Sequence, residues 1–258
     1  MKFYIFIFII LFKTTLFSQE LNILENQLNK LIEKRIFWSE NQNDQEYDSL
    51  SKYNNEFEKL ILTFSSTNTN TLSYKFNKIK VGLNIVTSTD GLFRIYTWNT
   101  FEGGTMQFYK NIFQYKFNGK VYSKLNKKDD DDNGCSFFEI NDVVTKGKHF
   151  YITSSISVGS SALYFYEAKI FSIQGGKFLE NENLIKTKSG LKNTLGYSVD
   201  LSNSSNRDRK DGIESRDYIA LIYDRKNKVI IIPLINGDGK VTKNKIKYQF
   251  NGKFFQKI

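Results

Sequence analysis

Tyr96, Trp98 and Glu102 are the residues whose types and spacing come nearest to a sugar-binding site. On one strand, Tyr96 and Trp98 would present two rings on the same face, where they could stack on a pyranose while Glu102 supplies an acid. Two aromatic residues at this spacing belong more often to a core. We favour the core. We expect Arg94, on the same face, to lie at the sheet edge or to pair with a carboxylate, because an unpaired buried guanidinium is costly.

An acidic run later in the chain contains the pattern D-x-D-x-N-G, with oxygen side chains at Asp129, Asp131 and Asn133. Alternate oxygen ligands before a glycine form the first half of a calcium loop. The second half is missing, since Ile140 occupies the position where a bidentate glutamate belongs. Neighbouring carboxylates also repel one another. We therefore expect a solvated loop tip with at most weak calcium binding, and no other cofactor.

Nucleophilic and zinc chemistry have few residues to draw on, because the chain contains one histidine, His149, and one cysteine, Cys135. The G-x-S-x-G motif of many serine hydrolases does not occur in the sequence. We expect His149 to be an exposed or hydrogen-bonded strand residue and Cys135 to fill space in the core. A zinc site is poorly supported, because its usual histidine and thiolate ligands are almost missing.

The stretch that carries the aromatic pair predicts a β-meander. Asp90-Gly91 and Asn118-Gly119 are two-residue turn signals, since glycine accepts the positive φ of tight hairpin turns. The β-branched and aromatic residues of 92–98 predict a strand after the first turn. Residues 105–117 predict one long or bulged strand that ends at the second turn.

Residues 1–18 have the pattern of an export signal. Lys2 precedes ten consecutive apolar residues, 3–12, which is shorter than the roughly 20 that a membrane-spanning helix needs. The small Ser18 suits the end of a cleavable leader, and we expect cleavage before Gln19. The mature chain would then have no transmembrane segment and would be periplasmic or secreted.

Residues 19–64 predict a helical hairpin. Leu21, Leu24, Leu28 and Leu31 recur at three- and four-residue steps, which places them on one face of a helix. A second helical period begins near Asp44, which we expect to cap that helix. Residues 65–71 consist only of Ser, Thr and Asn, with no core-forming residue, and we expect them to form a linker.

Residues 72–258 predict an antiparallel β domain. Short apolar and aromatic runs alternate with glycine-containing turns through this segment, while the polar residues 202–214 predict an exposed loop. We expect a mainly β fold with an N-terminal αα-hairpin, in which the strands form an antiparallel sandwich or a partly open barrel. A propeller-like β-meander is the alternative.

The chain is basic, with a formal net charge of +10. Such a balance can indicate an anionic partner. The charges are scattered, however, and Asp208 interrupts the densest basic group, Arg207, Arg209 and Lys210. We therefore expect no nucleic-acid partner.

Three motifs carry a resemblance to a known group of proteins: S-T-D-G-L-F-R-I-Y-T-W-N-T, then G-G-T-M, and near the end Y-Q-F-N-G-K-F-F. With the leader ending in F-S-Q-E, the chain resembles a group of uncharacterised exported proteins of the Bacteroidetes lineage. The resemblance implies export to the periplasm or beyond. It implies no ligand and no catalytic residue.

The sequence favours a secreted or periplasmic, non-enzymatic binding or structural protein, with an envelope polysaccharide or protein as the partner to consider. The reason is the export signal together with the lack of a nucleophile, metal or cofactor motif. The alternative is a carboxylate-dependent hydrolase that acts on an envelope or extracellular glycan, since two facing carboxylates about 5 to 10 Å apart would suffice for that reaction.

Overall fold

The structure of the protein is a computed structural model. It describes the chain except for residues 1, 42–43, 128, 130–131 and 208–218. Within helices, only the backbone is described at residues 2–18, 44–47, 205 and 207.

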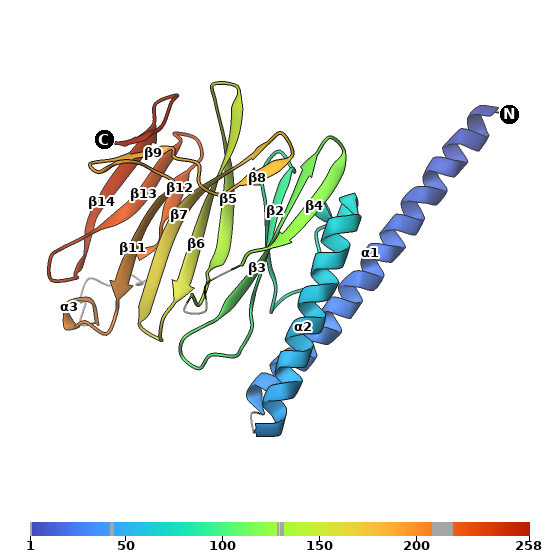
Figure 1. Ribbon diagram of the computed structural model, residues 1–258, viewed down its shortest axis with the longest axis horizontal. Helices are drawn as coiled ribbons and strands as arrows, with labels where there is room; N and C mark the ends of the chain where they lie inside the picture. Colours follow the sequence, from blue (N-terminus) through green and yellow to red (C-terminus); the bar gives the residue numbers. More distant parts are fainter. Residues whose placement is uncertain (1, 42–43, 128, 130–131, 208–218) are drawn as a thin grey trace.

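Two antiparallel helices form the N-terminal hairpin that the sequence predicts: α1 (Lys2–Glu40) and α2 (Asp44–Thr67). Leu24 and Leu28 of α1 and Phe57 of α2 are buried, with exposed fractions of 2%, 1% and 0%. Figure 1 shows the hairpin at one end of the molecule, against the first sheet. No helix in the described part of the chain is long and apolar enough to cross a membrane.

Residues 65–71 differ from the expected linker. Helix α2 continues to Thr67, and a 3₁₀ helix, η1 (Thr69–Leu72), follows it. The hydroxyls of Ser66 and Thr67 both donate to the Thr63 carbonyl, so side chains that usually favour loops extend the helix end. The Asn68 side chain then accepts from the backbone of Asn70 and caps η1.

Sheet A contains four strands in the order β1-β2-β3-β4. Asn118-Gly119 forms the predicted tight turn, with φ values of 47° and 78°. The Asp90-Gly91 turn is wider than predicted, because Ser88 and Phe93 are the residues whose backbones close it. The third strand is shorter than predicted, since residues 105–108 lie in a loop. The strands are β1 (Asn84–Thr87), β2 (Phe93–Asn99), β3 (Tyr109–Phe117) and β4 (Lys120–Leu125).

Sheet B follows, in the order β11-β7-β6-β5, with the short β8 paired to β7. Its central strands are long, and β6 pairs with both β5 and β7 over most of its length. The strands are β5 (Ser136–Thr145), β6 (Lys148–Val158), β7 (Leu163–Gln174), β8 (Lys177–Leu179) and β11 (Thr194–Asp200).

Sheet C has the order β10-β9-β15-β14-β13-β12. Its pairs are antiparallel except for β9 and β15, which run parallel. A short helix, α3 (Ser204–Arg207), lies where the sequence predicts only an exposed loop, and its Asn206 is buried because it bonds to the turn before β14. The strands are β9 (Ile185–Thr187), β10 (Gly190–Lys192), β12 (Ile222–Asp224), β13 (Val229–Ile235), β14 (Val241–Phe250) and β15 (Phe255–Lys257).

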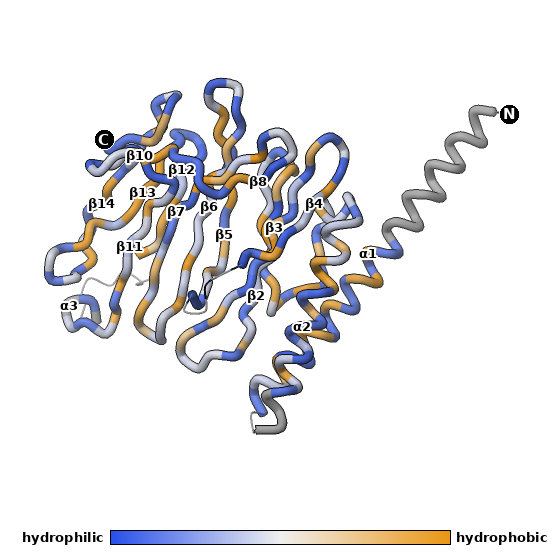
Figure 2. Tube along the Cα trace, viewed as in Figure 1, coloured by the Kyte–Doolittle hydropathy of each residue, from blue (hydrophilic) through white to orange (hydrophobic). Residues whose placement is uncertain are grey.

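Strand alternation stacks these parts in layers. In β2, Tyr96 and Trp98 face the helices, whereas Phe93 and Ile95 face sheet B. The opposite side of sheet B packs on sheet C through residues such as Ile152. Figure 2 shows apolar residues, in orange, along the strands of the sheets and along the helical hairpin. The fold is therefore mainly β, with open antiparallel sheets in a sandwich arrangement and no closed barrel.

The position of Arg94 differs from the expectation that it lies at the sheet edge or pairs with a carboxylate. Arg94 lies in an interior strand, is 5% exposed and pairs with no carboxylate of the residues that the structure describes. Its guanidinium donates instead to the Thr87 hydroxyl and to the backbone carbonyls of Thr71 and Tyr74. Carbonyl oxygens at the end of η1 thus take the role that a carboxylate was expected to have.

Candidate functional site

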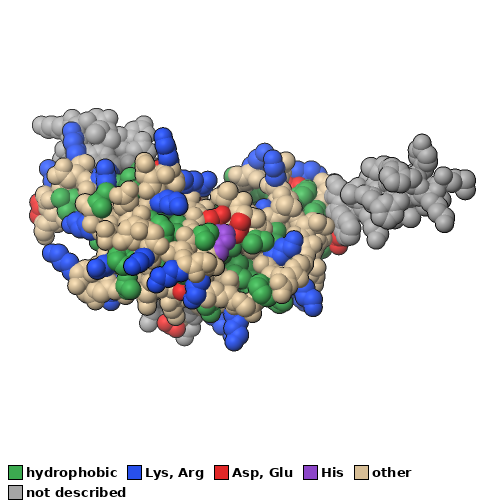
Figure 3. Space-filling view, turned by 90° about the horizontal axis from the view of Figure 1, so that it is seen from above, with side chains coloured by type: hydrophobic (Ala, Val, Ile, Leu, Met, Phe, Trp, Pro, Cys, Tyr) green, Lys and Arg blue, Asp and Glu red, His purple; other side chains and the backbone are tan. Residues whose placement is uncertain are grey.

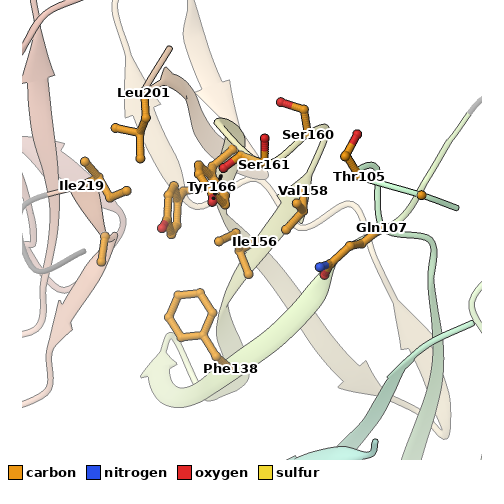
Figure 4. Close-up of a pocket in the computed structure, with 13 residues that line it drawn as sticks. Thr105, Gln107, Phe138, Ile156, Val158, Ser160, Ser161, Tyr166, Leu201 and Ile219 are labelled. Carbon is orange, nitrogen blue, oxygen red and sulfur yellow. Dashed lines mark hydrogen bonds between the residues drawn. The ribbon is translucent and has the colours of Figure 1, made fainter. Parts of the chain in front are cut away.

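A pocket of about 870 Å³ opens at one end of the interface between sheets B and C. Figure 4 shows the side chains that line it. The lining residues come from the β2–β3 loop, β5, β6, β7, the end of β11 and the segment before β12: Gly104, Thr105, Gln107, Phe138, Ile156, Val158, Ser160, Ser161, Tyr164, Tyr166, Leu201, Ile219 and Ala220.

Regular strand geometry positions the apolar walls. Ile156 and Val158 alternate with residues of the opposite face of β6, and Tyr164 and Tyr166 do the same on the neighbouring β7. These four side chains therefore point to the same side of sheet B. Tyr166 is further held by stacking on Tyr197 of β11, with ring centroids 5.5 Å apart.

Turns fix the polar rim. The hydroxyl of Ser160 accepts from the backbone of Ala162 and Leu163, which holds the β6–β7 turn. The Gln107 backbone donates to the Val158 carbonyl at 3.0 Å and brings the β2–β3 loop to the end of β6. The lining residues that the structure describes carry hydroxyl and amide groups but no charge. Such a pocket can enclose an uncharged, largely apolar molecule and bond it at the rim.

The residues first considered for sugar binding lie elsewhere. Tyr96 and Trp98 are 2% and 1% exposed beneath the helical hairpin, and Trp98 meets Phe57 edge to face at 5.5 Å. This burial supports the core role for Trp98. A hollow of about 400 Å³ includes Trp98 and Phe101 among its lining, but the indole offers that hollow almost no surface.

Glu102 belongs to a buried polar network. Its carboxylate accepts from the Asn54 side chain at 3.2 Å, and the Asn54 amide oxygen accepts from Arg35 at 2.6 Å. Arg35 also donates to the Asn99 carbonyl, so the network joins α1, α2 and the end of β2. Burial lowers the pKa of Arg35 to about 10, and the Glu102 charge partly opposes that change. This arrangement anchors the helices to sheet A.

The acidic run is described only in part, because Asp131 lies outside the described residues. Asn133 uses its side-chain amide to donate to the carbonyls of Gln107 and Val158, both at 3.1 Å. The Asp129 carbonyl accepts from the backbone of Asp132. The weak calcium site at Asp129, Asp131 and Asn133 stays a prediction.

A second polar cluster lies at the opposite end of β6 from the pocket, where Asp90, Asp142 and His149 meet. Tyr151 donates its hydroxyl to Asp90 at 2.9 Å and stacks on His149 with ring centroids 4.9 Å apart. Burial, followed by the charge of Asp90, raises the pKa of Asp142. His149 lies in a strand, as the sequence predicts, but it is half-buried and its Nδ1 lies 3.4 Å from Asp90 Oδ2. The sequence does not reveal that Asp90 and Asp142 lie beside it.

Paired carboxylates also occur in a hollow of about 470 Å³ beside β8, lined in part by Glu180 and Glu182. Each is already engaged: Glu180 pairs with Lys124, and Glu182 accepts from Ser172 and Gln174. These contacts are structural. They do not leave two carboxylates free to face a substrate.

Sequence reasoning missed the large pocket. Its lining is assembled from segments far apart in the chain, and only the small-residue turn around Ser160 and Ser161 stands out in the sequence. No protein-family model, no curated protein and no solved structure matches the chain.

Proposed function

We propose that this protein is an exported binding protein that holds an uncharged, largely apolar small molecule in the pocket between sheets B and C. The pocket itself is the observation that carries the proposal. Its volume of about 870 Å³ lies within the range of roughly 300 to 1,000 Å³ that is typical of small-molecule sites.

The chemistry of the lining supports this ligand class. Ile156, Val158, Leu201 and Ile219 supply aliphatic surface, and three aromatic residues supply ring faces. A charged ligand would lose its hydration without gaining an ion partner from the described lining, which is unfavourable. Hydroxyl, carbonyl or amide groups on the ligand could instead bond to the rim near Thr105 and Gln107.

Binding suits this pocket better than hydrolysis does. The described lining contains no Asp, Glu, His, Cys or Lys, so it offers no general base and no pair of facing carboxylates. The only hydroxyl nucleophile candidates would be those of Thr, Ser and Tyr residues, and Ser160 already holds the β6–β7 turn. The pocket therefore supports retention of a ligand.

A neutral apolar dye tests the proposal. N-phenyl-1-naphthylamine, which fluoresces when it leaves water, should bind the full chain at one saturable site. Ser161→Trp and Thr105→Trp would each place an indole at the pocket mouth and should abolish this binding. Ser189→Trp, at an exposed turn between β9 and β10, is the matched control and should bind like the wild type. Equal binding by all three variants would contradict the assignment.

Export has its own support and its own test. It rests on Lys2, the apolar run of residues 3–12 and Ser18. Mass spectrometry of the protein from periplasmic and medium fractions should give a chain that starts at Gln19. A mature protein that retains residues 1–18 and stays in the cytoplasm would contradict export without affecting the pocket.

A further inference from the structure

The cluster of Asp90, Asp142 and His149 combines two carboxylates with an imidazole at the junction of two sheets. Asp90 lies in the β1–β2 loop of sheet A, whereas Asp142 and His149 belong to β5 and β6 of sheet B. One ligand atom from each residue lies within 4.8 Å of the other two. Figure 3 shows the chain's one histidine, in purple, beside red carboxylate atoms on the face seen from above.

The contacts inside the cluster leave donor atoms unused. Asp142 accepts from the Asp90 backbone with Oδ2 at 2.9 Å, while its Oδ1 is buried and has no partner among the described residues. His149 Nδ1 lies 3.4 Å from Asp90 Oδ2, which is long for a charge-assisted hydrogen bond. His149 Nε2 is buried without a described partner too. A buried acceptor left unpaired is costly, and a cation bound at this cluster would remove that cost.

Neighbouring groups already hold the side chains in place. Asp90 accepts with Oδ1 from the Ser88 hydroxyl and the Leu92 backbone, and with Oδ2 from Tyr151. The Tyr151 ring also stacks on His149. Outer contacts of this kind orient the ligands of metal sites and fix their rotamers.

We propose that Asp90, Asp142 and His149 bind one zinc ion, which joins sheet A to sheet B. Imidazole nitrogen and carboxylate oxygen are both common zinc ligands, and an imidazole in the set favours zinc over calcium or magnesium.

The spacing fits this ion after a small adjustment. Tetrahedral zinc with bonds of about 2.0 to 2.2 Å places neighbouring ligand atoms about 3.4 Å apart. The separation of 3.4 Å between His149 Nδ1 and Asp90 Oδ2 already has this value. The ligand atom of Asp142 lies within 4.8 Å of the other two, so it would need to approach them by at most about 1.4 Å. Water can complete the tetrahedron, because the side chain of His149 is 31% exposed.

The single histidine makes the test direct. Full-length protein without a histidine tag is treated with a chelator and titrated with zinc sulfate, with heat of binding as one readout. The second readout is the ¹H–¹⁵N spectrum of the imidazole, which contains the signals of His149 alone. One zinc per chain should bind, the imidazole nitrogen signals should shift in proportion to it, and the melting temperature should rise.

Variants identify the ligands. His149→Gln and Asp142→Asn should each weaken zinc binding by about tenfold or more. Asp238→Asn, in the turn before β14, is the matched control and should not change it. Calcium should bind more weakly than zinc, and calcium binding should not depend on His149.

Two results would overturn the proposal. One is zinc saturation of the wild type with no change in the imidazole signals, which needs no variant to fold. The other is zinc affinity that His149→Gln leaves intact.

Discussion

The two main apolar interfaces of this molecule are built from similar residues but are filled to different degrees. Where the helical hairpin packs on sheet A, the cavity beside Leu24, Phe76 and Tyr96 has a volume of about 10 Å³. Where sheet B packs on sheet C, one end opens into a pocket of about 870 Å³. Dense packing is the norm inside proteins, so the open end is the exception that requires an explanation.

This difference in packing indicates that the filled interface is the scaffold and that the open end between sheets B and C is the binding site. A filled interface contributes stability through contacts that any large-to-small substitution removes. An open end leaves side chains such as Ile156 with fewer contacts and with surface available to a ligand. A substitution in the filled interface should therefore mainly lower stability, whereas a substitution at the open end should mainly affect ligand binding.

The largest effect should come from the filled interface. Trp98→Ala should lower the free energy of unfolding by about 3 to 5 kcal/mol, because the indole is 1% exposed and packs on Phe57. Trp38→Ala removes the only other tryptophan, which is partly exposed, and should cost about 1 kcal/mol or less. Denaturant melts measure both. Equal midpoints for the two variants would remove Trp98 from the core.

The same substitution on one face of β6 should show the change from filled to open. Ile152 is 0% exposed between sheets B and C, so Ile152→Ala should cost about 3 kcal/mol. Ile156, four residues later, borders the pocket, and Ile156→Ala should cost about 1 kcal/mol. A larger loss for Ile156→Ala than for Ile152→Ala would mean that the pocket closes in solution.

The next largest loss of stability should come from the polar network under the helices. Asn54→Ala removes the partner of Arg35 and the donor to Glu102, and should cost about 2 kcal/mol, since bonds to charged groups contribute about 1.5 to 3 kcal/mol. Asn55→Ala changes an exposed neighbour and should cost less than about 0.5 kcal/mol. Thermal and denaturant melts compare them, and identical stabilities would show that the network is not an anchor.

The smallest effect should come from the pocket mouth. Ser161 is exposed, so Ser161→Trp should change the free energy of unfolding by less than about 0.5 kcal/mol while it blocks dye binding. Denaturant melts and the dye titration give the two quantities. If lost binding were accompanied by a large loss of stability, the variant would report on folding and not on the pocket.

Local signals in the sequence predicted much of the scaffold. Asn118-Gly119 adopts the positive φ angles of a tight turn, and the leucine period that begins at Leu21 forms the buried face of α1. Each of these features depends on residues close in the chain.

The partners of buried polar groups could not be predicted in the same way. Arg94 finds backbone carbonyls of Thr71 and Tyr74, which have no side-chain signature in a sequence. Asp90, Asp142 and His149 meet only because sheets A and B stack. The pocket depends in the same way on the packing of sheets B and C, so strand patterns alone could not reveal either site.

The most direct test of the central claim is methyl NMR of isoleucine-labelled protein during addition of N-phenyl-1-naphthylamine. We expect shifts at Ile156 and Ile219, which line the pocket, and none at Ile61 or Ile112 under the helical hairpin. Ile→Val variants assign the signals. Shifts confined to Ile61 and Ile112, or no shifts at saturation, would contradict the claim that the open end between sheets B and C is the binding site.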